Sequence, residues 1–170
     1  MTSAAWAAVA LAVAACAFDL RTRRIPNALT FGAAAAGFLF HGLFSGLAGF
    51  GWSVAGWAVG LLLFLPLFLL RGMGGGDVKL LAAIGAWIGP GTVIWVALFA
   101  SIAGGVFALA LALTRGYTRQ AFTNLWGLLS YWKVMGMRPN PALTLESAPA
   151  SRLPYALPMA AGLGLALWLR

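Results

Sequence analysis

Long apolar segments, separated by short basic connections, constrain this sequence more than any other feature. Hydrophobic residues make up 62% of the chain, whereas charged residues make up 8%. A soluble domain of this length cannot bury so much apolar surface, so the sequence predicts an integral membrane protein. The expected fold class is all-α: one domain, residues 1–170, that forms a polytopic bundle of six transmembrane helices.

Five of the six predicted spans are continuous apolar segments: residues 4–18, 28–44, 52–70, 92–114 and 155–169. An uncharged outer loop is expected at residues 45–51. The fourth apolar segment, residues 80–88, has only nine residues before an expected turn at residues 89–91. Nine residues are too few to cross a bilayer at about 1.5 Å per residue. We therefore expect residues 72–76 to dip into the membrane, so that this short helix starts at Asp77 beside an aqueous pocket.

The basic residues mark the predicted cytoplasmic side. Ten of the eleven Lys and Arg residues lie in three connections, residues 19–27, 71–79 and 115–152. This is the positive-inside pattern of cytoplasmic loops, and it argues against nucleic acid as a partner despite the net charge of +8. Both termini are then expected outside. Residues 1–15 contain no Lys or Arg, which predicts a retained first helix rather than a cleaved signal peptide.

The connection after the fifth span contains a predicted amphipathic helix. Arg119 and Lys133 flank its apolar residues, which recur at helical spacing. These apolar residues are Phe122, Leu125, Trp126, Leu129 and Trp132. The pattern predicts an interfacial helix that lies on the inner membrane surface in contact with membrane lipid. Prolines in residues 137–151 predict an irregular segment after it.

Two of the three acidic residues stand at the edges of apolar segments. Asp19 follows the first span, and Asp77 follows a glycine-rich segment, residues 72–76, that precedes the fourth span. Consecutive glycines predict unusual φ/ψ angles and close approach by other backbone. An ionisable residue at the edge of a span is costly and points to a function. The simpler interpretation is a glycine-rich connector whose Asp77 caps the next helix.

The two aspartates together favour a catalytic interpretation, because both are expected at the cytoplasmic edge of the bundle. Two carboxylates that share a low-dielectric pocket cannot both ionise cheaply, so one of them holds a proton. The charged carboxylate can take a proton from water as the water attacks an amide, and the neutral one can protonate the carbonyl oxygen or the leaving nitrogen. This is the chemistry of aspartic proteolysis. Arg21 and Lys79, each two residues after an aspartate, are nearby cations rather than facing partners.

No other group of residues in the sequence offers a competing catalytic set. His41 stands alone in an apolar segment, and Glu146 lies in the irregular connection as a solvated charge. A metal site built from Asp19, Asp77 and Glu146 would have no His ligand and no recognisable spacing, so we expect neither a metal nor a cofactor. The single cysteine, Cys16, excludes an intramolecular disulfide.

Three motifs, in this order along the chain, resemble the type IV prepilin peptidase family. Residues 19–27 are similar to the loop that carries its first aspartate, and residues 74–77 have the Gly-x-Gly-Asp signature. Residues 153–162 resemble its last-span motif, with Ala156 where Gly is common. The resemblance implies an aspartyl endopeptidase of the bacterial inner membrane. Its substrates would be type IV prepilins and pseudopilins, from which it removes a basic leader peptide at the cytoplasmic face.

The resemblance also implies roles for particular residues. Asp19 and Asp77 correspond to the catalytic aspartates, and the active-site loop comprises Gly74, Gly75, Gly76 and Lys79. Between the first two spans there is no cysteine-bearing cytoplasmic domain of the kind that longer members carry, which implies the short form that serves tight-adherence (Flp-type) pili. Two other functions are compatible with the sequence. One is a small proton-coupled transporter that uses both aspartates as a relay, and the other is a structural subunit of a pilus or secretion apparatus.

Overall fold

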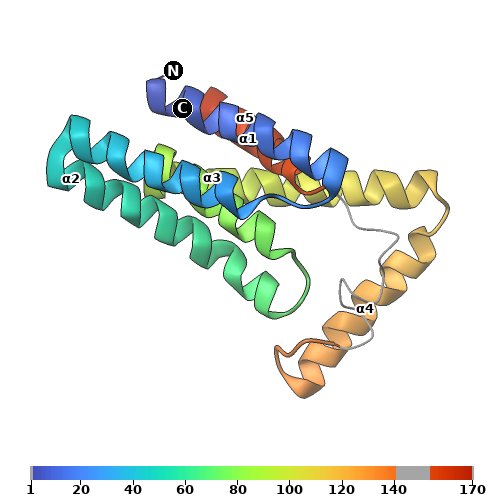
Figure 1. Cartoon of the computed structure of the whole chain (residues 1–170). Helices are drawn as coiled ribbons and strands as arrows, with labels where there is room; N and C mark the ends of the chain where they lie inside the picture. Colours follow the sequence, from blue (N-terminus) through green and yellow to red (C-terminus); the bar gives the residue numbers. More distant parts are fainter. Residues whose placement is uncertain (1, 141–153, 170) are drawn as a thin grey trace.

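The computed structural model describes residues 2–140 and 154–169, and every regular element in these residues is an α-helix (Figure 1). In chain order the helices are α1 Ser3–Thr22, α2 Asn27–Leu69, α3 Gly75–Thr114, α4 Thr118–Met135 and α5 Ala156–Trp168. Among these helices, α1, α2 and α3 are long and apolar enough to cross a membrane, and α5 is a shorter apolar helix. The predicted all-α fold is thus confirmed, and the long apolar helices are consistent with the predicted membrane protein.

Two glycines divide α2 and α3 into antiparallel arms. The backbone leaves the helical conformation at Gly46 (φ 63°, ψ −155°) and at Gly89 (φ 77°, ψ 174°), in a region of positive φ that favours glycine. Each helix folds back on itself there, as Figure 1 shows. Ring contact between Phe38 and Phe50, with centroids 6.0 Å apart, joins the arms of α2. Together with α1 and α5, the four arms give six apolar helical segments in the described part of the chain.

The two breaks correct the predicted boundaries. The expected loop over residues 45–51 is wrong, because helix continues on both sides of Gly46 and a single left-handed glycine is enough to reverse the chain. The turn predicted at residues 89–91 is confirmed at Gly89. The short fourth helix begins at Gly75, two residues before the predicted start at Asp77.

Side chains from α2 satisfy the carbonyl groups that the break in α3 leaves open. Pro90 has no N–H, so the carbonyl of Ala86 has no helical donor four residues later. The Ser53 hydroxyl donates to this carbonyl over 2.6 Å, and Nε2 of His41 hydrogen-bonds the carbonyl of Trp87 over 3.1 Å. His41 therefore makes a structural contact. Such pairing is needed because an open backbone group in an apolar bundle costs several kcal/mol, on the order of 2–7.

Close glycine contacts place the first arm of α3 at the centre of the bundle. A Cβ added at Gly56 of α2 would collide with the backbone of Gly85, and one added at Gly60 would lie 2.7 Å from the Leu81 carbonyl oxygen. The backbones therefore approach more closely than larger side chains would allow. Leu80, Leu81 and Ile84 are fully buried in this arm. Asp77 thus lies in the first turn of the most buried arm of the bundle.

The predicted helix in the connection after α3 is confirmed as α4. Four of its five predicted apolar residues are exposed, namely Phe122, Leu125, Trp126 and Leu129. Trp132 instead donates its indole N–H to the carbonyl of Arg138 over 3.1 Å. Residues 141–153, which include Glu146 and Arg152, lie outside the described residues.

We predict that Gly60→Ala destabilises the bundle, whereas Gly51→Ala, in the same arm of α2, does not. The Gly60 methyl group would press on the Leu81 carbonyl, so the arms must separate at a cost of about 1–3 kcal/mol. At Gly51 an added Cβ meets no atom within 4 Å, and helix propensity favours Ala by up to about 1 kcal/mol. Unfolding of the purified variants in detergent measures both effects. Equal stability of the two variants would contradict the close-packing account.

Candidate active site

Asp19 lies in the last turn of α1, which corrects the predicted end of the first span at residue 18. The helix continues to Thr22 and ends where Arg23 adopts a left-handed conformation (φ 53°). Asp19 is 8% exposed. A carboxylate near a helix C-terminus opposes the helix dipole, and its burial costs further free energy. Local structure therefore does not favour Asp19 at this position.

The first residue of α5 compensates for this unfavourable position. The backbone N–H of Ala156 donates to Oδ2 of Asp19 over 3.3 Å, a buried contact between residues 137 positions apart. The N-terminus of a helix carries partial positive charge and open N–H groups, so it stabilises a negative group beside it. Asp19 is thus held by the end of a different helix from its own.

Asp77 is the third residue of α3, and its carboxyl group folds back over the start of the helix. Gly74 precedes the helix in extended conformation (φ −74°, ψ 143°), and its backbone hydrogen-bonds the Asp77 carboxyl group. A side chain at this position that reaches back to the N-cap residue is half of a capping box. Asp77 therefore does cap the helix, as the simpler interpretation expected. A carboxyl group has two oxygens, so a cap leaves acceptor capacity for another partner.

The structure brings the two predicted aspartates together. The charge of Asp19 acts on Asp77, which places the two carboxyl groups within range of direct electrostatic interaction. The connection before α2 packs on the start of α3: the Ile25 side chain lies 3.4 Å from a Cβ built at Gly76, and Lys79 Nζ donates to Asn27 Oδ1 over 3.0 Å. These contacts hold the connection after Asp19 against the helix that carries Asp77.

The glycines of the predicted active-site loop are needed for space rather than for unusual backbone angles. The expectation of unusual φ/ψ is wrong, because Gly74, Gly75 and Gly76 do not have positive φ, whereas Arg71 in the same connection does (φ 57°). A Cβ at Gly74 would lie 3.1 Å from Asp77 Oδ2, and one at Gly75 would lie 3.2 Å from the Phe68 ring.

Lys79, the last predicted member of this loop, is directed toward α2. Besides its hydrogen bond to Asn27, its ammonium group lies 5.3 Å from the centroid of the Phe31 ring. This agrees with the expectation that residues two apart on a helix do not face each other. Lys79 therefore joins the two helix starts.

Two features at the start of α5 were not predicted from the sequence. Ala156 donates to Asp19, and Tyr155 lies within electrostatic range of Asp77. The motif over residues 153–162 includes both residues, but the resemblance implied no role for either of them. Together these features make three chain segments, the end of α1, the start of α3 and the start of α5, converge on one place.

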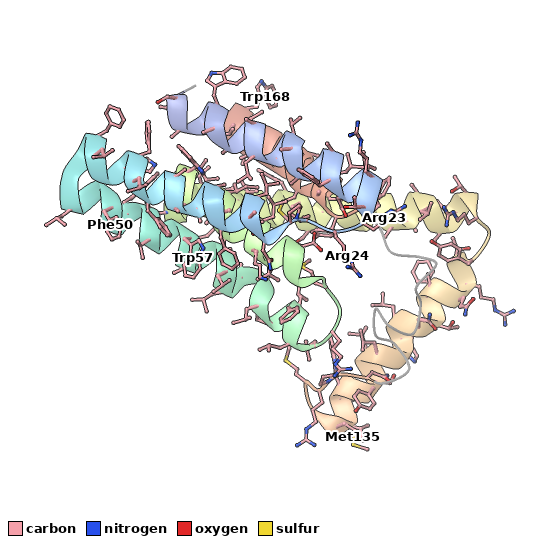
Figure 2. The ribbon with its side chains drawn as sticks, in the orientation of Figure 1. Arg23, Arg24, Phe50, Trp57, Met135 and Trp168 are labelled. Atoms are coloured by element: carbon pink, nitrogen blue, oxygen red, sulfur yellow. The ribbon has the colours of Figure 1, made fainter. Side chains whose placement is uncertain are left out.

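The basic connections lie at the same end of the bundle as this convergence. Arg23 and Arg24 lie between α1 and α2, and Figure 2 shows them at the end opposite Phe50. The connections α1–α2 and α2–α3 both lie toward this end, whereas the folds of α2 and α3 lie at the other (Figure 1).

Comparison with known proteins identifies the family. The profile described as "Type IV leader peptidase family" matches residues 6–109, a range that includes both aspartates. The chain belongs to this family. The Prepilin leader peptidase/N-methyltransferase of Aeromonas salmonicida (strain A449) is 37% identical over 119 residues, which cover 66% of this chain and 39% of that protein.

A second relative matches the chain to a similar extent. The Prepilin leader peptidase/N-methyltransferase of Burkholderia pseudomallei (strain 1026b) is 37% identical over 123 residues, or 68% of this chain and 39% of that protein. The match thus spans about two fifths of the length of these curated relatives. No solved structure matches the chain significantly.

If Asp77 is a catalytic group, as the sequence predicts, Gly74→Ala is expected to lower leader-peptide cleavage by about 10- to 100-fold, since displacing a reacting group by about 1 Å costs this much. The new methyl group would press on Asp77 Oδ2 at 3.1 Å. Gly72→Ala is the matched control, because its Cβ would make an ordinary contact of 3.5 Å with the Leu67 carbonyl. Initial rates on a prepilin in detergent measure the effect. Equal rates for both variants would show that the space at Gly74 does not position Asp77.

Proposed function

We propose that the chain is an intramembrane aspartyl endopeptidase that removes the leader peptide from type IV prepilins or pseudopilins of the Flp type. The observation that carries the proposal is the electrostatic interaction between Asp19 and Asp77, which come from the end of α1 and the start of α3. Membership of the leader peptidase family supports the substrate class. The short connection of residues 23–26 between α1 and α2 supports the Flp-type assignment.

In the proposed reaction the two carboxyl groups share the proton transfers. The ionised carboxylate takes a proton from water while the water oxygen bonds to the carbonyl carbon of the scissile amide, and the neutral carboxyl group protonates the carbonyl oxygen. The C–N bond then breaks as the nitrogen receives a proton from the first carboxyl group, while the second carboxylate takes a proton back from a hydroxyl group of the tetrahedral intermediate, so that the product acid forms and both carboxyl groups return to their starting protonation states. We assign the base to Asp19, because its carboxylate contacts the N-terminus of α5, where negative charge is stabilised.

In the proposed membrane arrangement all six apolar segments cross the bilayer, and the connections rich in Lys and Arg are cytoplasmic. As one straight helix, the 43 residues of α2 would extend about 65 Å, twice a hydrocarbon core of about 30 Å, so two crossings suit its two arms. The site then opens to the cytoplasm of a bacterial inner membrane. The exposed Phe122 and Trp126 of α4 would lie in the lipid interface on that side.

Cleavage in a defined system tests the proposed function. We expect the purified chain to convert a Flp-type prepilin into a product shorter by the leader, seen as a gel shift. We expect Asp77→Asn to lower the rate by a factor on the order of 10⁴ or more with unchanged unfolding in detergent, because Asn keeps the size but not the proton transfer. A transporter or a structural subunit would leave the prepilin uncut. An active Asp77→Asn variant would also contradict the proposal.

Cysteine labelling tests the orientation. In a Cys16→Ala background, we expect Arg24→Cys to react with a membrane-impermeant maleimide only after the membrane is opened. Leu47→Cys, 91% exposed beside the fold of α2, is expected to react from outside in intact cells. The reverse pattern would place the aspartates on the outer face and would contradict cleavage of a cytoplasmic leader.

A further inference from the structure

The turn that starts α5 contacts Asp19 and lies within electrostatic range of Asp77, but it contributes no group to the proposed proton transfers. Its backbone reaches Asp19 through the N–H of Ala156, and Tyr155 is the residue within range of Asp77. These residues are consecutive, so a small displacement of this turn would alter the surroundings of both carboxyl groups together.

The N–H of Ala156 is left open by the local sequence of α5. The first N–H groups of a helix have no intrahelical acceptor. In this turn, Leu157 donates to the carbonyl of Pro154 over 3.2 Å, and Pro158 has no N–H. The N–H of Ala156 consequently has Asp19 as its acceptor, and it is fixed before any substrate arrives.

The ring of Tyr155 holds this turn against the second arm of α3. Gly104 provides the space: a Cβ built there would lie 2.8 Å from Cε2 of the ring. Phe64 packs edge-on against the same ring with centroids 5.9 Å apart, and the hydroxyl donates to the Ala100 carbonyl over 3.4 Å. Phe64 is 3% exposed, so the ring meets a packed surface. Ring, glycine and phenylalanine together determine where α5 begins.

We propose that Tyr155 is a positioning residue of the active site, whose ring, seated on Gly104, holds the N-terminus of α5 where the Ala156 N–H reaches Asp19. The inference rests on the proposed peptidase function. Misplacing a reacting group by about 1 Å lowers the rate by about 100-fold, so an effect of this size is expected without unfolding. Tyr155 is half-buried between helices, so a change here is expected to alter kcat rather than KM.

Two adjacent glycines of α3 provide a matched test. Gly104→Ala forces the Tyr155 ring to move, whereas Gly105→Ala adds the same methyl group one residue later, where no atom lies within 4 Å. We expect Gly104→Ala to lower kcat on a Flp-type prepilin by about 10- to 100-fold with KM unchanged. We expect Gly105→Ala to match the wild type. Equal kcat for the two variants would overturn the proposal, and so would a loss confined to KM.

Substitution of the tyrosine itself keeps the test decisive if Gly104→Ala does not fold. Tyr155→Phe retains the ring and is expected to keep kcat within about threefold of the wild type, since a weak hydrogen bond is worth about 0.5 kcal/mol. Tyr155→Leu removes the ring and is expected to lower kcat as Gly104→Ala does. Wild-type kcat in Tyr155→Leu would overturn the positioning role while leaving the peptidase function intact. An inactive wild type would overturn both.

Discussion

Placing two carboxyl groups inside a bundle of apolar helices is the constraint on which the other features of this structure depend. Asp19 opposes the dipole of its own helix and is nearly buried, so α1 alone would disfavour it there. The open N–H of Ala156 provides the missing partner. The same requirement explains Ser53 and His41, which pair with carbonyl groups freed at the break in α3. These polar groups thus each form a hydrogen bond with a residue of another helix.

Close packing at glycines positions the helix arm that carries Asp77. The first arm of α3 is short, yet it is the most buried part of the bundle because Gly56 and Gly60 let its backbone approach α2 closely. The buried position of this arm fixes where Asp77, in its first turn, lies in the bundle. Rigid placement of both aspartates by separate helices suits chemistry that depends on two groups held at a fixed separation.

The sequence predicted the features that local patterns encode, and it failed where distant residues decide. Apolar segments and the Gly-x-Gly-Asp motif led to the helical bundle and to both aspartates, and Gly89-Pro90 marked a true break. The end of α1 was misplaced because an acid followed by arginines is typical of a loop, whereas the partner that stabilises the Asp19 carboxylate lies 137 positions away. Likewise, the glycines before Asp77 suggested unusual φ/ψ, but tertiary neighbours show that space is what they provide. The residues near Tyr155 and Ala156 in the sequence do not indicate that Tyr155 packs on Gly104 or that Ala156 donates to Asp19.

The claim that Asp19 and Asp77 act as one catalytic unit is tested most directly by a double-mutant cycle. Cleavage rates are measured for Asp19→Asn, Asp77→Asn and the double variant, each checked for unchanged unfolding in detergent. Groups that act in a single chemical step show strong non-additivity, so each single change is predicted to reduce the rate almost as far as both together. Additive losses, or substantial cleavage by Asp19→Asn, would contradict the account.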